Sequence, residues 1–274
     1  MPVLITGGHR WLARRLAARL VAEGGEVRVY GSEGAAALRA AGVLVASGTP
    51  DDEGRLDAAL TDVHTLVHVG PGLLAPDPGL IRAEAEVAAR AAASAGVRRV
   101  ITLSLPGAEA TSSDPLRRAK ATEEAALAGV PAPTVVVRAS LLDTAGLRDA
   151  LATAGLADEE LDVEVAPLRT EDLVELVVAF DRARSRGDDG TLLVAADGPE
   201  RLTLGAYLDR VGVRIAGRIP LLGRRVLDEQ RAVRLRTALT GGPWVAPPGP
   251  VLDGWSFAEL QPQSITPSTR SGGR

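Results

Sequence analysis

The stretch Val3-Leu4-Ile5-Thr6-Gly7-Gly8-His9-Arg10-Trp11-Leu12-Ala13 decides the fold of this chain. A short apolar run ends at a glycine pair, and a helical pattern begins directly after it. Apolar side chains then recur every fourth residue until Gly24-Gly25, which predicts an amphipathic helix over residues 10–23. A buried strand, a tight turn and a helix start form the unit with which α/β domains bind the phosphates of a dinucleotide.

The same rhythm of strand and helix continues through the first 140 residues and loosens beyond them. Right-handed crossovers convert such an alternation into a parallel sheet with helices on both faces. We expect strands over residues 2–6, 27–30, 43–45, 64–69, 98–103, 134–138, 162–166 and 191–195, and helices over 10–23, 33–41, 51–60, 79–95, 115–129, 145–154, 170–183, 203–212 and 225–239.

The predicted fold is therefore α/β, a doubly wound parallel sheet with a small C-terminal lobe on the substrate side. Residues 1–140 are expected to form a nucleotide-binding-type domain, and residues 141–260 the remaining sheet elements and the lobe. Residues 261–274 are poor in apolar side chains, so we predict a disordered tail there.

Composition excludes several classes of function. The chain carries 31 basic and 35 acidic residues, a net charge of −4, which argues against a nucleic-acid-binding protein. It contains no cysteine and three scattered histidines, so neither a disulfide framework nor a metal site is expected. No apolar run is long enough for a bilayer, and no signal-type segment follows Met1. We expect a soluble cytoplasmic protein with a small-molecule substrate and no membrane partner.

Five stretches in order along residues 2–212 resemble the short-chain dehydrogenase/reductase superfamily, in its extended and atypical branches (NmrA-like and NAD-dependent epimerase-like). They are Ala95–Ile101, the helix of Lys120, Thr134–Arg138, Leu168–Leu173 and Gly190–Leu204. The resemblance implies a Rossmann-like fold with an NAD(P) site at the first turn. Relatives commonly dimerise through the helices that correspond to residues 79–95 and 114–129, so the resemblance also allows a homodimer.

The first turn departs from the family pattern, which places glycines at the positions of Gly7, Arg10 and Ala13, or of Gly7, Trp11 and Ala13 in the shorter branch. In either register the middle glycine is replaced by a large side chain. One interpretation is that Arg10 binds a phosphate of NADP(H); the other is that Arg10 or Trp11 fills the site and no dinucleotide binds. The expected cofactor is accordingly none or NADP.

We name five candidate cofactor-binding residues at this turn. They are Gly7, His9, Arg10, Trp11 and Leu12. Strand two, which ends in Tyr30-Gly31-Ser32, offers neither the acid nor the basic residue with which the family selects between the riboses of NAD and NADP.

The catalytic groups that the resemblance implies are only partly present. The family's tyrosine acid stands four residues before its lysine, but Leu116 holds that position before Lys120, the only lysine of the chain. Ser104 ends strand five, where the family has a serine pair. His68 ends strand four, at the sheet edge where an imidazole can act as acid or base. Lys120, His68 and Ser104 are our catalytic candidates; surface, core and strand-capping roles are the alternatives.

Three functions are compatible with a crevice that has lost the middle glycine, the ribose acid and the tyrosine. The first, which we favour from the sequence, is a non-redox enzyme of bacterial specialised metabolism, such as a cyclase, isomerase or dehydratase. The second is an NADP(H)-dependent oxidoreductase of the atypical type. The third is an NmrA-like regulatory protein that senses a nucleotide without catalysis.

Overall fold

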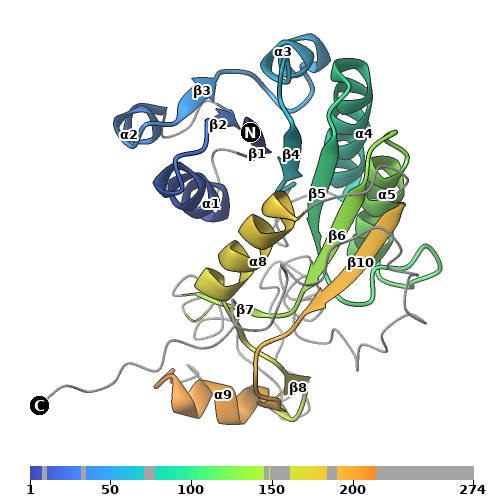
Figure 1. Cartoon of the computed structure of the whole chain (residues 1–274). Helices are drawn as coiled ribbons and strands as arrows, with labels where there is room; N and C mark the ends of the chain where they lie inside the picture. Colours follow the sequence, from blue (N-terminus) through green and yellow to red (C-terminus); the bar gives the residue numbers. More distant parts are fainter. Residues whose placement is uncertain are drawn as a thin grey trace, which may run out of the picture.

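A parallel sheet of seven strands organises the computed structural model, which describes residues 1–7, 11–31, 35–70, 78–144, 148, 161–183 and 190–213. Its strand order is β10-β6-β5-β4-β1-β2-β3, and Figure 1 shows β3 and β10 at opposite edges. Every pairing within it is parallel. The strands are β1 (Val3–Thr6), β2 (Val27–Tyr30), β3 (Leu44–Ala46), β4 (Thr65–His68), β5 (Arg99–Ser104), β6 (Thr134–Ala139) and β10 (Thr191–Ala196).

Helices cover both faces of this sheet, which confirms the predicted doubly wound α/β architecture. On one face α1 (Trp11–Ala22) packs against α8 (Thr170–Arg182), with α2 (Ala35–Ala40) contributing Leu38 to the same core. On the other face α4 (Pro78–Ala95) lies between α3 (Glu53–Ala59) and α5 (Pro115–Ala128). The chain begins in the middle of the sheet at β1 and crosses to the other side at β4, so the strand order reverses between these two strands.

The alternation of side chains in β1 explains why the sheet has two cores. Val3 and Ile5 point to the face of α1 and α8, whereas Leu4 points to the face of α3 and α4. All four residues of β1 are buried. A central parallel strand is apolar on both faces because helices cover both, and this is the pattern on which the strand prediction rested.

The helix at Lys120 begins as its sequence predicts. The Asp114 carboxylate accepts a hydrogen bond of 2.8 Å from the Leu116 amide, and Pro115 occupies the first turn, where no amide hydrogen is needed. The helix runs to Ala128 and ends at Gly129. Its register is thus set by local chemistry, and this register decides which side chains of α5 face the sheet.

A small lobe follows β6. In it β7 (Leu142–Asp143) pairs with β9 (Leu168–Arg169), and β8 (Glu164–Val165) pairs with β11 (Leu202–Thr203) ahead of α9 (Leu204–Arg210). Leu141, Tyr207 and Leu208 belong to its own apolar cluster. The predicted strand at 162–166 is reduced to β8, and the sequence did not predict β7, β9 or β11, because two-residue strands leave no periodicity to detect.

Several predictions fall outside the described residues: the helix at 225–239, the tail at 261–274 and, apart from residue 148, the helix at 145–154. The domain boundary at residue 140 stays a prediction. No helix in the described part of the chain combines the length and the apolar character that a membrane span requires. The same part contains no group of three or more His, Cys, Asp or Glu side chains that could hold a metal ion.

Candidate functional site

The candidate site lies at the carboxyl edge of the sheet, where the strand order reverses between β1 and β4. Crevices at such reversal points are the usual ligand sites of open α/β sheets. β1 ends there in Thr6 and Gly7, and Gly7 has a φ of 74°, a left-handed conformation that favours glycine. His9 and Arg10, two of the predicted cofactor-binding residues, lie outside the described residues.

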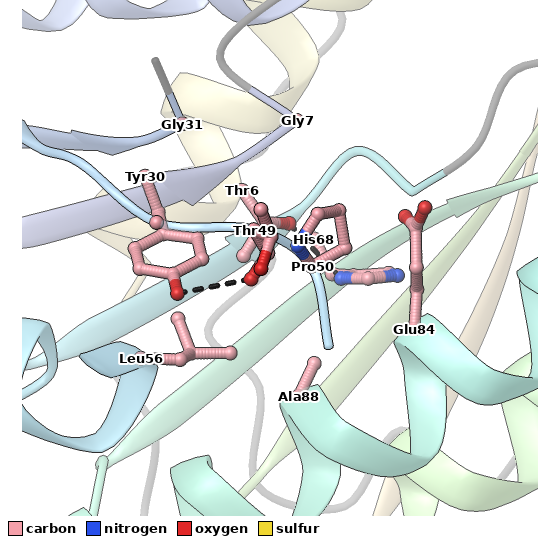
Figure 2. Close-up of a pocket in the computed structure, with 11 residues that line it drawn as sticks. Thr6, Gly7, Tyr30, Gly31, Thr49, Pro50, Leu56, His68, Glu84 and Ala88 are labelled. Atoms are coloured by element: carbon pink, nitrogen blue, oxygen red, sulfur yellow. Dashed lines mark hydrogen bonds between the residues drawn. The ribbon is translucent and has the colours of Figure 1, made fainter. Parts of the chain in front are cut away.

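A pocket of about 130 Å³ opens beside this turn. Figure 2 shows Tyr30 on one side of it and Glu84 on the other, with Thr6 and His68 between them. The ends of β1, β2 and β4, the loop after β3 and helices α3 and α4 all contribute to its walls. Its lining residues are Thr6, Gly7, Tyr30, Gly31, Gly48, Thr49, Pro50, Leu56, His68, Glu84 and Ala88.

Tyr30 forms a fixed wall of the pocket. Its hydroxyl donates towards two carbonyl oxygens, that of Thr49 at 3.0 Å and that of Asp52 at 3.1 Å, and burial raises its pKa. A Cβ atom on Gly48 would lie 2.1 Å from the Tyr30 hydroxyl, so glycine is needed for this close approach. Tyr30, Thr49 and Glu84 were not among the predicted site residues; the position of Tyr30 at a strand end was the one signal in the sequence.

Trp11 and Leu12 do not line the pocket. The Trp11 side chain is 43% exposed, and the Arg15 guanidinium lies 5.9 Å from the centre of its ring. Leu12 is buried in the core between α1 and the sheet. In this structure the Trp11 side chain therefore does not fill the pocket beside Gly7, and Arg10, the other side chain expected to fill the site, lies outside the described residues. The helix start directs the Trp11 side chain outward, because the neighbouring positions 12 and 13 are the ones that face the sheet.

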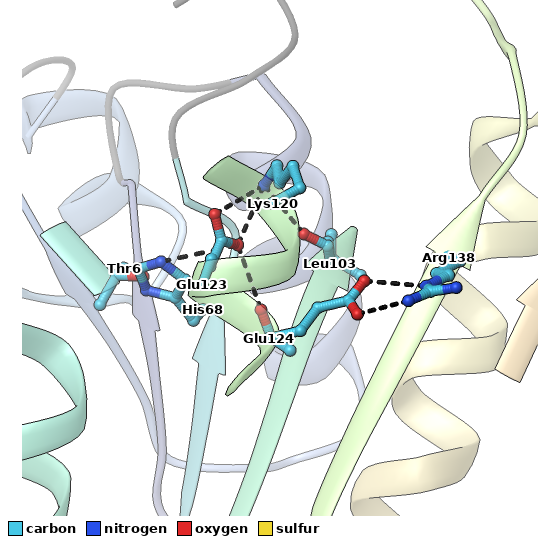
Figure 3. A network of polar contacts seen from close by, with 8 residues as sticks. Thr6, His68, Leu103, Lys120, Glu123, Glu124 and Arg138 are labelled. Carbon is cyan, nitrogen blue, oxygen red and sulfur yellow. Dashed lines mark hydrogen bonds and ion pairs between the residues drawn. The ribbon is translucent and has the colours of Figure 1, made fainter. Parts of the chain in front are cut away.

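Behind the pocket, His68, Lys120 and Glu123 form a buried polar network (Figure 3). The Lys120 ammonium lies 2.9 Å from each carboxylate oxygen of Glu123 and donates to the Leu103 carbonyl at 3.1 Å. Thr102 donates a further hydrogen bond of 3.3 Å to Glu123. His68 Nε2 lies 4.0 Å from Glu123 Oε1, and His68 Nδ1 is 2.9 Å from the Thr6 hydroxyl. Two predicted catalytic residues, far apart in sequence, are thus brought together by Glu123.

The charge of Lys120 is compensated inside the protein. Its side chain is 4% exposed, and its three N–H donors have three acceptors in Glu123 and Leu103. Burial raises the pKa of Glu123 to about 7, although Lys120 and the hydrogen bonds to the carboxylate act in the opposite direction. The structure thus places Lys120 behind the crevice and not in the pocket.

Ser104 and Leu116 are two further positions to which the family resemblance draws attention. Ser104 is buried, and its hydroxyl has no hydrogen-bond partner within the described ranges. Leu116, which the resemblance places at the position of the family tyrosine, belongs to a small apolar cluster with Ile81 and Leu105. Its side chain offers no hydroxyl group there.

A second hollow of about 350 Å³ lies between the first turns of α4 and α5. Its lining includes Arg82, Arg118 and Thr122, all of them exposed side chains. None of the predicted site residues that the structure describes borders this hollow. Of the predicted residues, Gly7 and His68 line the first pocket, and Lys120 belongs to the buried network behind it.

No family model matches the sequence. A curated relative from Streptomyces griseus, "(4-alkanoyl-5-oxo-2,5-dihydrofuran-3-yl)methyl phosphate reductase", is 30% identical over 246 residues, which are 86% of this chain and 80% of the relative. A nucleoside-diphosphate-sugar epimerase from Staphylococcus aureus has a similar fold, with a TM-score of 0.72, 14% identity and coverage of 97% of this chain and 96% of that one. The Citrobacter sp. triphenylmethane reductase complexed with NADP(H) reaches a TM-score of 0.69 at 16% identity, over 90% of this chain and 92% of that one.

The two solved structures are too distant in sequence to establish more than the fold. The Streptomyces relative is 30% identical and similar over most of both chains. The chain belongs to the short-chain dehydrogenase/reductase superfamily, in its atypical branch.

Proposed function

We propose that the chain is an NADP(H)-dependent reductase of a small molecule whose carbon–carbon double bond is conjugated to a carbonyl group. The observation that carries the proposal is the pocket at the strand reversal, which lies beside Gly7 and whose lining does not include Trp11. The sequence favoured a non-redox enzyme because large side chains replace the middle glycine. Trp11 is exposed and does not line the pocket, so it is not the side chain that replaces the cofactor there.

The described residues fit a dinucleotide. The left-handed turn at Gly7 and the start of α1 would hold the pyrophosphate, because backbone amides at a helix start favour anions. Tyr30, Gly31 and Thr49 would contact the adenosine half. β2 ends without a carboxylate at Tyr30 or Gly31, so neither residue there repels a 2′-phosphate. When bound, the nicotinamide supplies a hydride.

The absence of a tyrosine at position 116 indicates which class of substrate accepts the hydride. Reduction of an isolated carbonyl concentrates negative charge on one oxygen and needs a positioned acid. After hydride addition to a conjugated double bond, the charge spreads over the neighbouring carbonyl, which lowers that demand. Leu116 in place of the tyrosine is therefore compatible with such a substrate. The name of the Streptomyces relative, a reductase of an alkanoyl-oxo-dihydrofuranyl methyl phosphate, supports the same class.

Titration calorimetry with NADPH and NADH tests the cofactor. We expect micromolar binding of NADPH and weaker binding of NADH. Thr49→Trp places a large side chain at the rim of the pocket and should weaken NADPH binding by about 10-fold or more, since it removes space that the ligand needs. Ser47→Trp, in the same loop but outside the pocket lining, is the matched control and should bind as the wild type does.

Activity is then measured as consumption of NADPH with unsaturated lactones and enones, against saturated ketones as the comparison set. Turnover of the conjugated compounds alone is the expected result. A non-redox cyclase, isomerase or dehydratase of specialised metabolism is the second candidate, favoured by the internal neutralisation of Lys120. That candidate replaces the first if neither dinucleotide binds. NADPH binding without turnover of any acceptor supports an NmrA-like sensor.

A further inference from the structure

A row of buried polar side chains extends from α5 to the end of β1, next to the turn at Gly7. It runs from Lys120 through Glu123 and His68 to Thr6, and crosses from α5 over β4 to β1 (Figure 3). Lys120, Glu123, His68 and Thr6 are all at most 7% exposed. Lys120 is the family lysine, and Thr6 directly precedes the predicted phosphate-binding turn. The row therefore joins the two halves of the predicted site.

The contact between His68 and Glu123 is closed off by backbone. Gly70 has a φ of 63°, and a Cβ atom there would lie 3.0 Å from Glu123 Oε1 and 3.1 Å from His68 Nε2. A side chain at this position would separate the two groups. The left-handed glycine thus keeps the carboxylate facing the ring at 4.0 Å.

The carboxylate determines how His68 can contact Thr6. A negative charge beside Nε2 favours the proton on that nitrogen, so Nδ1 is left as the acceptor for the Thr6 hydroxyl. If Glu123 loses its charge, this preference weakens and the hydrogen bond at the end of β1 is no longer fixed. Gly7, the next residue, then loses a constraint on its orientation.

We propose that Glu123 is a positioning residue for dinucleotide binding, acting through His68 and Thr6 on the turn at Gly7. This proposal rests on the proposed function for its ligand, NADPH. It assigns a role to a residue that does not line the pocket. In this proposal Lys120 keeps Glu123 charged, because its ammonium group lowers the pKa of the carboxylate.

The proposal makes NADPH binding dependent on pH. The groups that face Glu123 are Lys120 and Glu124 from its own helix, Thr102 from β5 and His68 from β4. Burial raises the pKa of Glu123 to about 7, so its charge changes within the range in which binding can be measured. Affinity for NADPH should fall as the pH decreases through this value, by about 10-fold in all, the usual size of a coupling between two sites.

Calorimetric titration of NADPH at several pH values tests this with Glu123→Gln, which keeps the shape and removes the charge. Glu124→Gln is the matched control, because Glu124 is the next residue and is also ion-paired but turns away from His68. We expect Glu123→Gln to bind weakly at every pH, and Glu124→Gln to follow the wild-type curve. The 2′-phosphate titrates in all three proteins, so the difference between the curves reports Glu123 together with the group coupled to it, His68.

A second measurement needs no ligand. The ring resonance of His68 is followed by NMR across the same pH range; the chain has only three histidines, and His9→Gln and His64→Gln complete the assignment. Glu123→Gln should shift the His68 midpoint, whereas Glu124→Gln should not. Thr6→Val should reproduce the weak binding of Glu123→Gln, and Thr6→Ser, which keeps the hydroxyl, should restore it.

The outcomes are distinct. The proposal is overturned if Glu123→Gln leaves both the His68 titration and the pH profile of NADPH binding as in the wild type. A common loss in Glu123→Gln and Glu124→Gln also overturns it, since that indicates general damage to α5. If no protein binds NADPH, the proposed function fails, and an unshifted His68 midpoint in Glu123→Gln then also excludes the link from Glu123 to β1.

Discussion

Two adjacent glutamates of α5, Glu123 and Glu124, have the same side chain and opposite roles. Glu123 is fully buried and faces Lys120 and the end of β4. Glu124 turns to β6, where its carboxylate accepts hydrogen bonds of 2.9 and 2.6 Å from the Arg138 guanidinium. The Arg138 side chain is 13% exposed and also donates to the Ala108 carbonyl.

The groups that contact each buried carboxylate differ, and they determine what the carboxylate can do. Glu124 meets a guanidinium that matches its two oxygens, and the pair fastens α5 to β6. Glu123 meets an ammonium, a hydroxyl and an imidazole, groups whose protonation or orientation can change. The first pair is therefore structural, whereas the second is suited to transmit a change of charge.

Lys120→Met should have the largest effect on the difference between the two glutamates. This change leaves Glu123 buried without its cation, and breaking a buried ion pair on one side costs about 3–5 kcal/mol. Urea denaturation at a pH above the Glu123 pKa measures the loss. The double variant Lys120→Met/Glu123→Gln, with no buried charge, should recover most of it. If the single and the double variant unfold at the same urea concentration, the loss in Lys120→Met does not come from an uncompensated charge on Glu123.

The pH dependence of the unfolding free energy should also differ between variants of the two glutamates. Burial raises the folded-state pKa of Glu123 from 4.5 to about 7, so the folded protein holds this proton more tightly than the unfolded chain. Protonated Glu123 contributes fully to the unfolding free energy at pH values below the pKa of the unfolded chain, 4.5. This contribution, about 3 kcal/mol in total, is lost as the pH rises through about 7. The difference in unfolding free energy between wild type and Glu123→Gln should change across this window. The same difference for Glu124→Gln should stay flat.

Arg138→Met tests whether the ion pair between Arg138 and Glu124 is only structural. It removes both hydrogen bonds to Glu124 and leaves the carboxylate largely buried, at a cost of about 2 kcal/mol in unfolding free energy. Affinity for NADPH should be unchanged, because the pair does not contact the pocket lining. Arg138→Lys keeps the charge without the two-point contact and should lose less. A variant that folds normally but no longer binds NADPH would contradict the assignment.

Thr102→Val is the smallest change that acts on one glutamate alone. It removes the 3.3 Å hydrogen bond to Glu123 while keeping the volume of the side chain, and should cost about 1 kcal/mol. The His68 midpoint should shift slightly in the direction seen with Glu123→Gln. Thermal denaturation and NMR on one sample measure both effects. No shift would mean that Thr102 serves only the packing of β5.

Local patterns predicted most of the sheet and helices. The apolar residues of β1, the four-residue repeat of α1 and the Asp114-Pro115 start of α5 each specify one element through short-range chemistry. The same patterns placed His68 and Ser104 at strand ends, and therefore at one sheet edge. They could not place Tyr30 in the pocket wall, because its role depends on the Thr49 and Asp52 carbonyls of a distant loop.

Periodicity and motif order are local properties, and they were sufficient to predict the α/β fold and the sheet edge at which the candidate residues lie. The exposure of Trp11 and the ion pair between Lys120 and Glu123 depend on packing between distant segments, so they follow from the structure alone. Helical spacing allows Lys120 and Glu123 to meet, but burial against β4 and β5 makes the contact compulsory, since an unpaired charge cannot remain there. Thr6, which directly precedes the turn at Gly7, lies 2.9 Å from His68, and His68 faces that buried pair.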